Sequence, residues 1–265
     1  MSTNNGTPFM SQGIVKIILG MILRPKDTHS YLLAQGGHKW LYMAALATLM
    51  VIILAVISGP IIASYFEEIF IPNYVTLDDR FEITPEIQAQ MEQVLTHPII
   101  TIGFPAVFMV TMMWVGWLIW TVALHLVGMW LGGKHRFGQI WQVVVWSQLP
   151  IIFSGFLASI YILITGEFIF NLSLARLFDL EPDFPDLSFV QPSVGQMVMH
   201  ALLARIELFQ VWSLILIGIG MMVAVKLSIR KAILVILLVW GTFTLISILM
   251  VVISTIISTF IGMPG

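Results

Sequence analysis

Residues 102–131 read IGFPAVFMVTMMWVGWLIWTVALHLVGMWL, and the basic turn GGKHRF follows at residues 132–137. The first stretch contains no Asp, Glu, Lys or Arg. A helix needs about 20 apolar residues to cross the hydrocarbon core of a bilayer, so this stretch is long enough to span a membrane. It predicts a transmembrane helix that ends in a short basic loop.

Four further stretches have the same character. The five predicted transmembrane helices cover residues 40–62, 102–131, 143–166, 206–225 and 232–260. The composition agrees, because 58% of the 265 residues are hydrophobic and only 10% are charged, whereas a soluble domain usually has about 25% charged residues. Long apolar runs favour helices over the alternating strands of a barrel. We therefore predict an all-α integral membrane bundle of five transmembrane helices in residues 40–265, after an N-terminal cytoplasmic segment in residues 1–39.

The distribution of charge predicts the orientation of this bundle. Nine of the twelve Lys and Arg residues lie before the first spanning segment or in the second and fourth loops. Thirteen of the fourteen acidic residues lie in or beside the first and third loops. Basic residues in short loops stay on the cytoplasmic side during insertion. We expect a cytoplasmic N-terminus, a C-terminus outside, and a multi-pass protein of the inner (cytoplasmic) membrane, with the first spanning segment acting as its own insertion signal.

Short helices are also predicted outside the spanning segments. Ile14, Ile17, Ile18, Met21 and Ile22 share one helical face, as in a helix that lies in the membrane interface. In the first outer loop, a Thr-Pro pair at residues 84–85 is a typical helix start. The second outer loop has apolar residues among its acids and prolines, so we expect it to pack on the bundle. Both outer loops are predicted to be partly ordered.

Polar side chains inside the membrane are candidates for function, because they are costly there unless they are paired or solvated. His125 lies near the cytoplasmic end of the second segment, and Ser147 and Gln148 lie near the start of the third. Since these two helices are predicted to be antiparallel, His125 and Gln148 are expected to share a depth and to form a hydrogen bond. Such a bond contributes about 0.6 kcal/mol on average. It either holds the helices together or belongs to a proton or ligand site.

Pro150 is a candidate hinge in the third segment. Its ring removes a backbone donor, so the helix is predicted to kink there. Broken helices line the binding sites of some transporters. The kink therefore either shapes the packing of the bundle or allows a functional movement.

Glu207 and Gln210 are the remaining candidates, at the outer end of the fourth segment. Glu207 either extends outward to the lipid headgroups or lines an outer-facing polar pocket. In the second case, Glu167 at the outer end of the third segment is a possible further member.

The motifs of common enzyme classes are missing. There is no Cys, which excludes disulfides, thiolate metal sites and cysteine nucleophiles. The chain has no G-x-x-x-x-G-K-[ST], H-E-x-x-H or G-x-S-x-G sequence, and its six His residues are scattered. We therefore expect no catalytic, cofactor-binding or metal-binding residues, and no nucleic acid partner.

Residues 131–150 (LGGKHRFGQIWQVVVWSQLP) resemble the centre of bacterial Yip1-domain proteins, where a Gly-Gly-Lys-x-x-Phe turn leads into a helix with a polar pair and then Pro. Further similarity lies at residues 212–218 (WSLILIG), at residues 227–232 (LSIRKA), and at Arg24-Pro25 with Tyr31. This resemblance implies five transmembrane helices with a cytoplasmic N-terminus. It carries over no catalytic residues.

The resemblance also suggests a function. Eukaryotic members act in vesicle traffic and contact small GTPases, whereas bacterial members can accompany ABC-type exporters. The chain lacks the Asp-Leu-Tyr-Gly-Pro motif of the trafficking members, so a GTPase partner is not expected. The leading hypothesis is a non-enzymatic accessory or scaffold subunit of a membrane complex, associated with ABC-type permease or ATPase subunits. The alternative is a small self-contained transporter or channel with a polar site near His125 and Gln148.

Overall fold

The computed structural model describes residues 13–71, 84–166, 173–177 and 194–261. These residues form helices and no strand, apart from one isolated bridge between Ser173 and Glu207. The helices are α1 (Ile14–Leu23), α2 (Pro25–Gln35), α3 (Trp40–Tyr65), α5 (Pro85–Leu95), α6 (Phe104–Trp130), α7 (Phe137–Trp146), α8 (Leu149–Thr165), α9 (Leu174–Leu177), α10 (Val194–Leu203), α11 (Leu208–Ala224) and α12 (Ile229–Ile261). Short π-helical turns, Phe66–Phe70 and Ile99–Gly103, follow α3 and precede α6.

Four helical stretches in the described residues are long and apolar enough to span a membrane. They are Trp40–Glu68, Ile99–Trp130, Phe137–Thr165 and Ile229–Ser254, which correspond to the first, second, third and fifth predicted segments. The fourth predicted segment, residues 206–225, contains α11, an apolar helix of 17 residues. At about 1.5 Å per residue, α11 is slightly shorter than a hydrocarbon core of about 30 Å.

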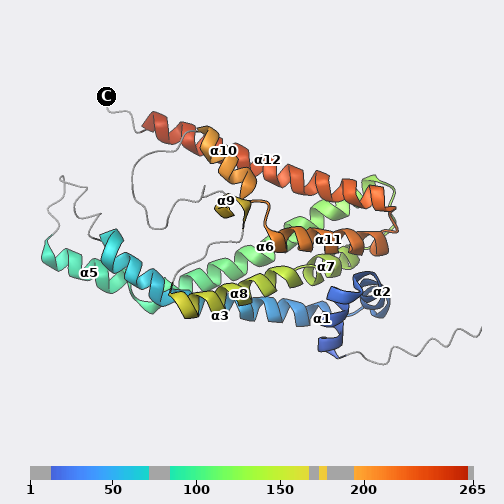
Figure 1. The fold of residues 1–265 in the computed structure, drawn as a ribbon, viewed down its shortest axis with the longest axis horizontal. Coiled ribbons are helices and arrows are strands. Elements are labelled where there is room, and N and C mark those ends of the chain that lie inside the picture. Colours follow the sequence, from blue (N-terminus) through green and yellow to red (C-terminus); the bar gives the residue numbers. More distant parts are fainter. Residues whose placement is uncertain (1–12, 72–83, 167–172, 178–193, 262–265) are drawn as a thin grey trace, which may run out of the picture.

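Helix α11 lies at the centre of the bundle, where it packs against α2, α7, α8 and α12. Helix α3 covers α8 and α6 on one side, and α12 contacts α6, α10 and α11 on the other. Figure 1 shows α3, α6, α8 and α12 running roughly along the long axis of the molecule. The buried apolar core is densest on α7, where Ile140 and the run Val143–Trp146 are fully buried.

The N-terminal segment is built into this bundle. Its predicted amphipathic helix is α1, in which Ile17 and Met21 are buried while Ile14 and Ile22 are exposed. The sequence analysis did not predict α2, which contacts α1, α7 and α11. Gln142 Nε2 donates a hydrogen bond to the backbone oxygen of Leu32 (3.2 Å) and ties α2 to α7. The α1–α2 hairpin therefore closes one end of the bundle (Figure 1).

The third predicted segment starts earlier than expected and is interrupted. Its helix begins at Phe137, not near Val143, and α7 and α8 are separated by a turn at Ser147 and Gln148. The interruption lies directly before Pro150, which cannot donate a backbone hydrogen bond to the preceding turn. A start six residues earlier places Gln148 about 9 Å deeper along the helix than the sequence analysis assumed.

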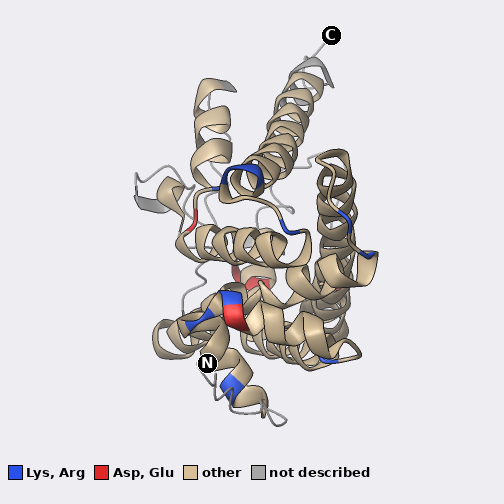
Figure 2. Ribbon diagram, turned by 90° about the vertical axis from the view of Figure 1, so that its right-hand side faces the viewer, with Lys and Arg blue, Asp and Glu red and all other residues tan. Residues whose placement is uncertain are grey.

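Most of the described Lys and Arg residues, though not Arg205 in the turn before α11, collect at one end of the molecule. They lie on or beside α1 and α2, in the α6–α7 turn and around the α11–α12 turn, and Figure 2 looks onto this end. We call it the basic end. At the opposite end, Thr84 Oγ1 accepts a hydrogen bond from the amide of Ile87 (3.5 Å) at the start of α5, as the Thr-Pro pair predicted.

Candidate functional site

Glu207 lies between two cavities on the side of the bundle away from the basic end. It occupies the N-cap position of α11, after the turn that follows α10. The backbone amide of Leu174 donates to the carbonyl of Ile206 (3.1 Å), and Ser173 pairs with Glu207 in the isolated bridge. Helix α9 thus holds the chain in place just before α11.

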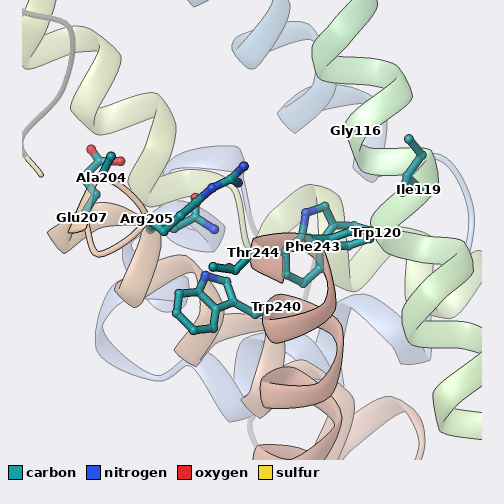
Figure 3. A pocket seen from close by; sticks show the side chains of 10 residues that line it. Gly116, Ile119, Trp120, Ala204, Arg205, Glu207, Trp240, Phe243 and Thr244 are labelled. Atoms are coloured by element: carbon teal, nitrogen blue, oxygen red, sulfur yellow. The ribbon is translucent and has the colours of Figure 1, made fainter. Parts of the chain in front are cut away.

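The first cavity, which we call the polar cavity, has a volume of about 420 Å³ and lies between α6, α12 and the α10–α11 turn. Its polar side chains are Arg205, Glu207, Gln210 and Thr244, and Trp120, Trp240 and Phe243 supply aromatic walls. Figure 3 shows Arg205 reaching toward Trp120 and Thr244, while the carboxylate of Glu207 points away from it. Within the described residues, neither Arg205 nor Glu207 makes an ion pair.

The second cavity, which we call the apolar cavity, has a volume of about 660 Å³ and lies between α3, α6 and α8. Most of its wall is apolar, with Met50, Met113 and Trp117 among the larger side chains. The polar groups in this wall are Gln148, Ser154, Tyr161 and Glu207. A cavity of this size and composition is typical of a site for a small amphipathic molecule.

The hydrogen bond of Glu207 links it to the apolar cavity. Ser154 Oγ on α8 donates to Glu207 Oε1 across 3.3 Å. A hydroxyl is a neutral partner, so it does not balance the charge of the carboxylate. The part of the chain that the structure describes supplies no basic group to the wall of the apolar cavity.

The expected hydrogen bond between His125 and Gln148 is not formed. The ring of His125 contacts the rings of His135 (4.8 Å between centroids) and Phe137 (5.6 Å), near the basic end. Gln148 lies deeper, in the wall of the apolar cavity, because α7 begins earlier than the sequence analysis assumed. The two halves of the predicted polar site are therefore separate.

The histidine pair packs a turn against α6. Among the described residues, the Nδ1 atom of His125 and both ring nitrogens of His135 are buried without a hydrogen-bond partner, and the His135 ring lies against Gly128. Burial, together with the neighbouring His125, lowers the pKa of His135. No group of three His, Asp or Glu residues with the spacing of a metal site occurs among the described residues. The arrangement fits a packing role.

Ser147 and Pro150 lie at the interruption between α7 and α8. The carbonyl of Ser147 accepts a buried hydrogen bond from Ser213 Oγ on α11 (2.8 Å), while Ser147 Oγ itself is buried without a partner. Pro150 is also buried. The broken helix is thus fastened to the central helix of the bundle.

Of the candidate residues, the structure brings Glu207 and Gln210 together in the polar cavity and Glu207 and Gln148 together in the apolar one. Glu167 lies outside the described residues. The sequence analysis missed Ser154, Tyr161 and Thr244. Ser and Thr inside a helix usually bond to the preceding turn, so their presence alone did not indicate a cavity.

The comparisons with known proteins give one match. The sequence model described as the Yip1 domain matches residues 19–251. No curated protein and no solved structure shows a significant match to the chain. The matched range covers all the residues that line the two cavities. It also covers the spanning stretches, except for the end of the last one in α12.

Proposed function

The chain belongs to the Yip1-domain family of membrane proteins, and we propose that it is a non-enzymatic accessory or scaffold subunit of a membrane complex. The observation that carries this proposal is the exposed apolar surface on the C-terminal half of α12. Apolar side chains there are exposed in the structure, including Leu245, Leu249, Met250, Ile253 and Ile257. This surface, which we call the α12 flank, is available to lipid or to the helices of another membrane protein.

Helix α12 is long and little buried. It has 33 residues, or about 50 Å, which exceeds a hydrocarbon core of about 30 Å. Among the four spanning stretches, α12 buries the smallest share of its residues and α7–α8 the largest. Figure 1 shows its final turns beside α10, away from α3 and α8. A partner helix packed on the flank would shield surface that the described part of the chain leaves exposed.

The proposed partner is the permease or ATPase subunit of an ABC-type exporter. The support is the resemblance of residues 131–150 to bacterial family members that accompany such exporters. In this arrangement the partner supplies ATP hydrolysis, and the Yip1-domain subunit supplies a binding surface. The alternative, a self-contained transporter built around His125 and Gln148, loses its site because these residues lie apart.

The proposal can be tested by site-specific cross-linking in the native membrane. A photo-reactive amino acid replaces Leu249 on the α12 flank, and a matched variant carries it at Leu163, an exposed position on α8. We expect a stoichiometric cross-link to a permease or nucleotide-hydrolysing subunit from position 249 and not from position 163. Repeated isolation in mild detergent without such a partner, and without that cross-link, would refute the proposal.

We also propose that the basic end is cytoplasmic. The support is the excess of Lys and Arg there, since such residues are retained on the cytoplasmic side. Because the chain has no Cys, a thiol reagent labels a single-cysteine variant only at the introduced residue. A thiol reagent that cannot cross the membrane should label Glu92→Cys in intact cells or spheroplasts, and should leave Arg136→Cys and Lys231→Cys unmodified. The reverse pattern would invert the orientation.

A further inference from the structure

We propose that the apolar cavity binds a hydrophobic monocation, that is, an apolar body with one positive charge, with Glu207 as the counter-ion. This inference does not depend on the accessory role proposed above. It rests on the charge and composition of the described wall of the cavity. The carboxylate of Glu207 is the only formal charge in that wall, and nearly all other groups are apolar.

The charge of Glu207 is not balanced by a basic group in the described wall of the apolar cavity. A partly buried ionised carboxylate is costly unless it is paired, solvated or bound by a cation. Glu207 is partly buried, and among the described residues its side chain accepts a hydrogen bond from the hydroxyl of Ser154. Arg205 is close in sequence but exposed, and its side chain points away from the carboxylate (Figure 3). A ligand cation would supply the missing opposite charge.

Aromatic side chains lie in the same wall. Trp117 and Tyr161 line the apolar cavity together with Glu207. The faces of Trp and Tyr rings attract cations, and the attraction is stronger where water is excluded. An anion would not be attracted by the ring faces and would be repelled by Glu207. The wall therefore discriminates by the sign of the charge.

The size of the apolar cavity is also suited to a small molecule. Its volume of about 660 Å³ falls within the range of about 300–1,000 Å³ that is typical of small-molecule sites. Met50 and Met113 contribute flexible side chains that adapt to different apolar shapes. The site thus suits a class of compounds with a common charge better than one rigid substrate.

The test compares two ions of the same shape and opposite charge. Tetraphenylphosphonium and tetraphenylborate are titrated against the full chain in nanodiscs, and binding is measured by equilibrium dialysis. We expect saturable binding of the cation. Glu207→Gln should weaken it at least about tenfold, which corresponds to about 1.4 kcal/mol. Equal saturable binding of the anion, or unchanged saturable binding of the cation to Glu207→Gln, would overturn the proposal.

Matched variants separate the site from general effects. Glu92→Gln removes an exposed acid on α5 and should bind the cation as the wild type does. Arg205→Gln removes the nearest positive charge in the sequence and should bind it equally or more tightly. Ala158→Phe fills the apolar cavity and should abolish binding, whereas Ala45→Phe adds the same ring to an exposed position of α3 and should not. Unchanged binding to a folded Ala158→Phe variant would also overturn the proposal.

Discussion

The two ends of the bundle differ in how closely they are packed. At the basic end, Met21, His29 and Leu32 of the N-terminal hairpin are almost fully buried, and α11 approaches them through a glycine, Gly220. At the other end, the bundle opens into two cavities around Glu207. Close packing makes small changes costly, whereas a cavity tolerates them. The basic end therefore sets the stability of the fold, and the other end is available for binding.

The largest effect is expected from the protonation of His29. Burial lowers the pKa of His29 from its ordinary value of 6.5 to about 4, and a backbone hydrogen bond with Leu216 opposes the shift only in part. Between these two values the unfolded chain binds a proton that the folded chain does not. The free energy of unfolding should thus fall by about 3 kcal/mol as the pH falls through this window, and should level off below it.

This prediction is checked by unfolding the protein in detergent at a series of pH values, followed by tryptophan fluorescence. Other groups titrate in the same range, so the informative quantity is the difference between the wild type and His29→Gln. That difference should shrink as the pH falls from 6.5 to 4. His38→Gln, which replaces an exposed histidine, is the matched control for the loss of an imidazole. A constant difference between wild type and His29→Gln would show that His29 is not buried in the neutral form.

A smaller effect is expected from adding one methyl group at the basic end. A Cβ atom at Gly220 would collide with Val143 and lie 3.1 Å from His29 Cε1. Gly220→Ala should lower the free energy of unfolding by about 1–3 kcal/mol, as is usual for overpacked cores. Gly241→Ala on α12 is the matched control, because a Cβ there meets nothing within 4 Å. Equal thermal stability of the two variants would contradict close packing at the basic end.

The sequence predicted the features that depend on local pattern. The length of the apolar runs predicted the positions of four spanning stretches, and the Thr-Pro pair predicted the start of α5. It did not predict that α2 is buried, because Pro25–Gln35 is polar in composition and only the long-range contact with α11 buries His29 and Leu32.

The candidate site was harder to predict than the fold. The sequence singled out Glu207 and Gln210, but it paired Gln148 with His125. Hydropathy alone did not show that α7 already begins at Phe137, because the first residues of this helix, Phe-Gly-Gln, are less apolar than the run that follows them. An error of a few residues in a helix start shifts the depth of every later side chain. Cavities also form between helices that are distant in sequence, as Ser154 and Glu207 show. Which side chains meet in such a cavity depends on tertiary packing, and a local sequence pattern does not predict it.

A third prediction concerns the interrupted helix between the two ends. Ser213 Oγ donates a buried hydrogen bond to the carbonyl of Ser147, where α7 stops. Ser213→Ala should cost about 0.6 kcal/mol, the average for polar contacts between membrane helices, and at most about 1.7 kcal/mol. Ser254→Ala removes a hydroxyl that bonds within its own exposed helix and should change thermal stability by less. A larger loss from Ser254→Ala would show that the interruption is not held by α11.

The smallest effect is expected at the wall of the apolar cavity. A Cβ atom at Gly155 would lie 3.4 Å from Met50 Cγ, an ordinary contact with a flexible side chain. Gly155→Ala should therefore change the free energy of unfolding by no more than about 0.5 kcal/mol, since no group must move far. The same methyl group added at Gly220 is expected to cost several times more. Because both glycines lie inside helices, their helix propensities cancel in the comparison, and the difference between the two variants measures packing alone. If Gly155→Ala destabilises the protein as much as Gly220→Ala, the wall of the cavity is as rigid as the basic end, and adaptable binding there would lose its physical basis.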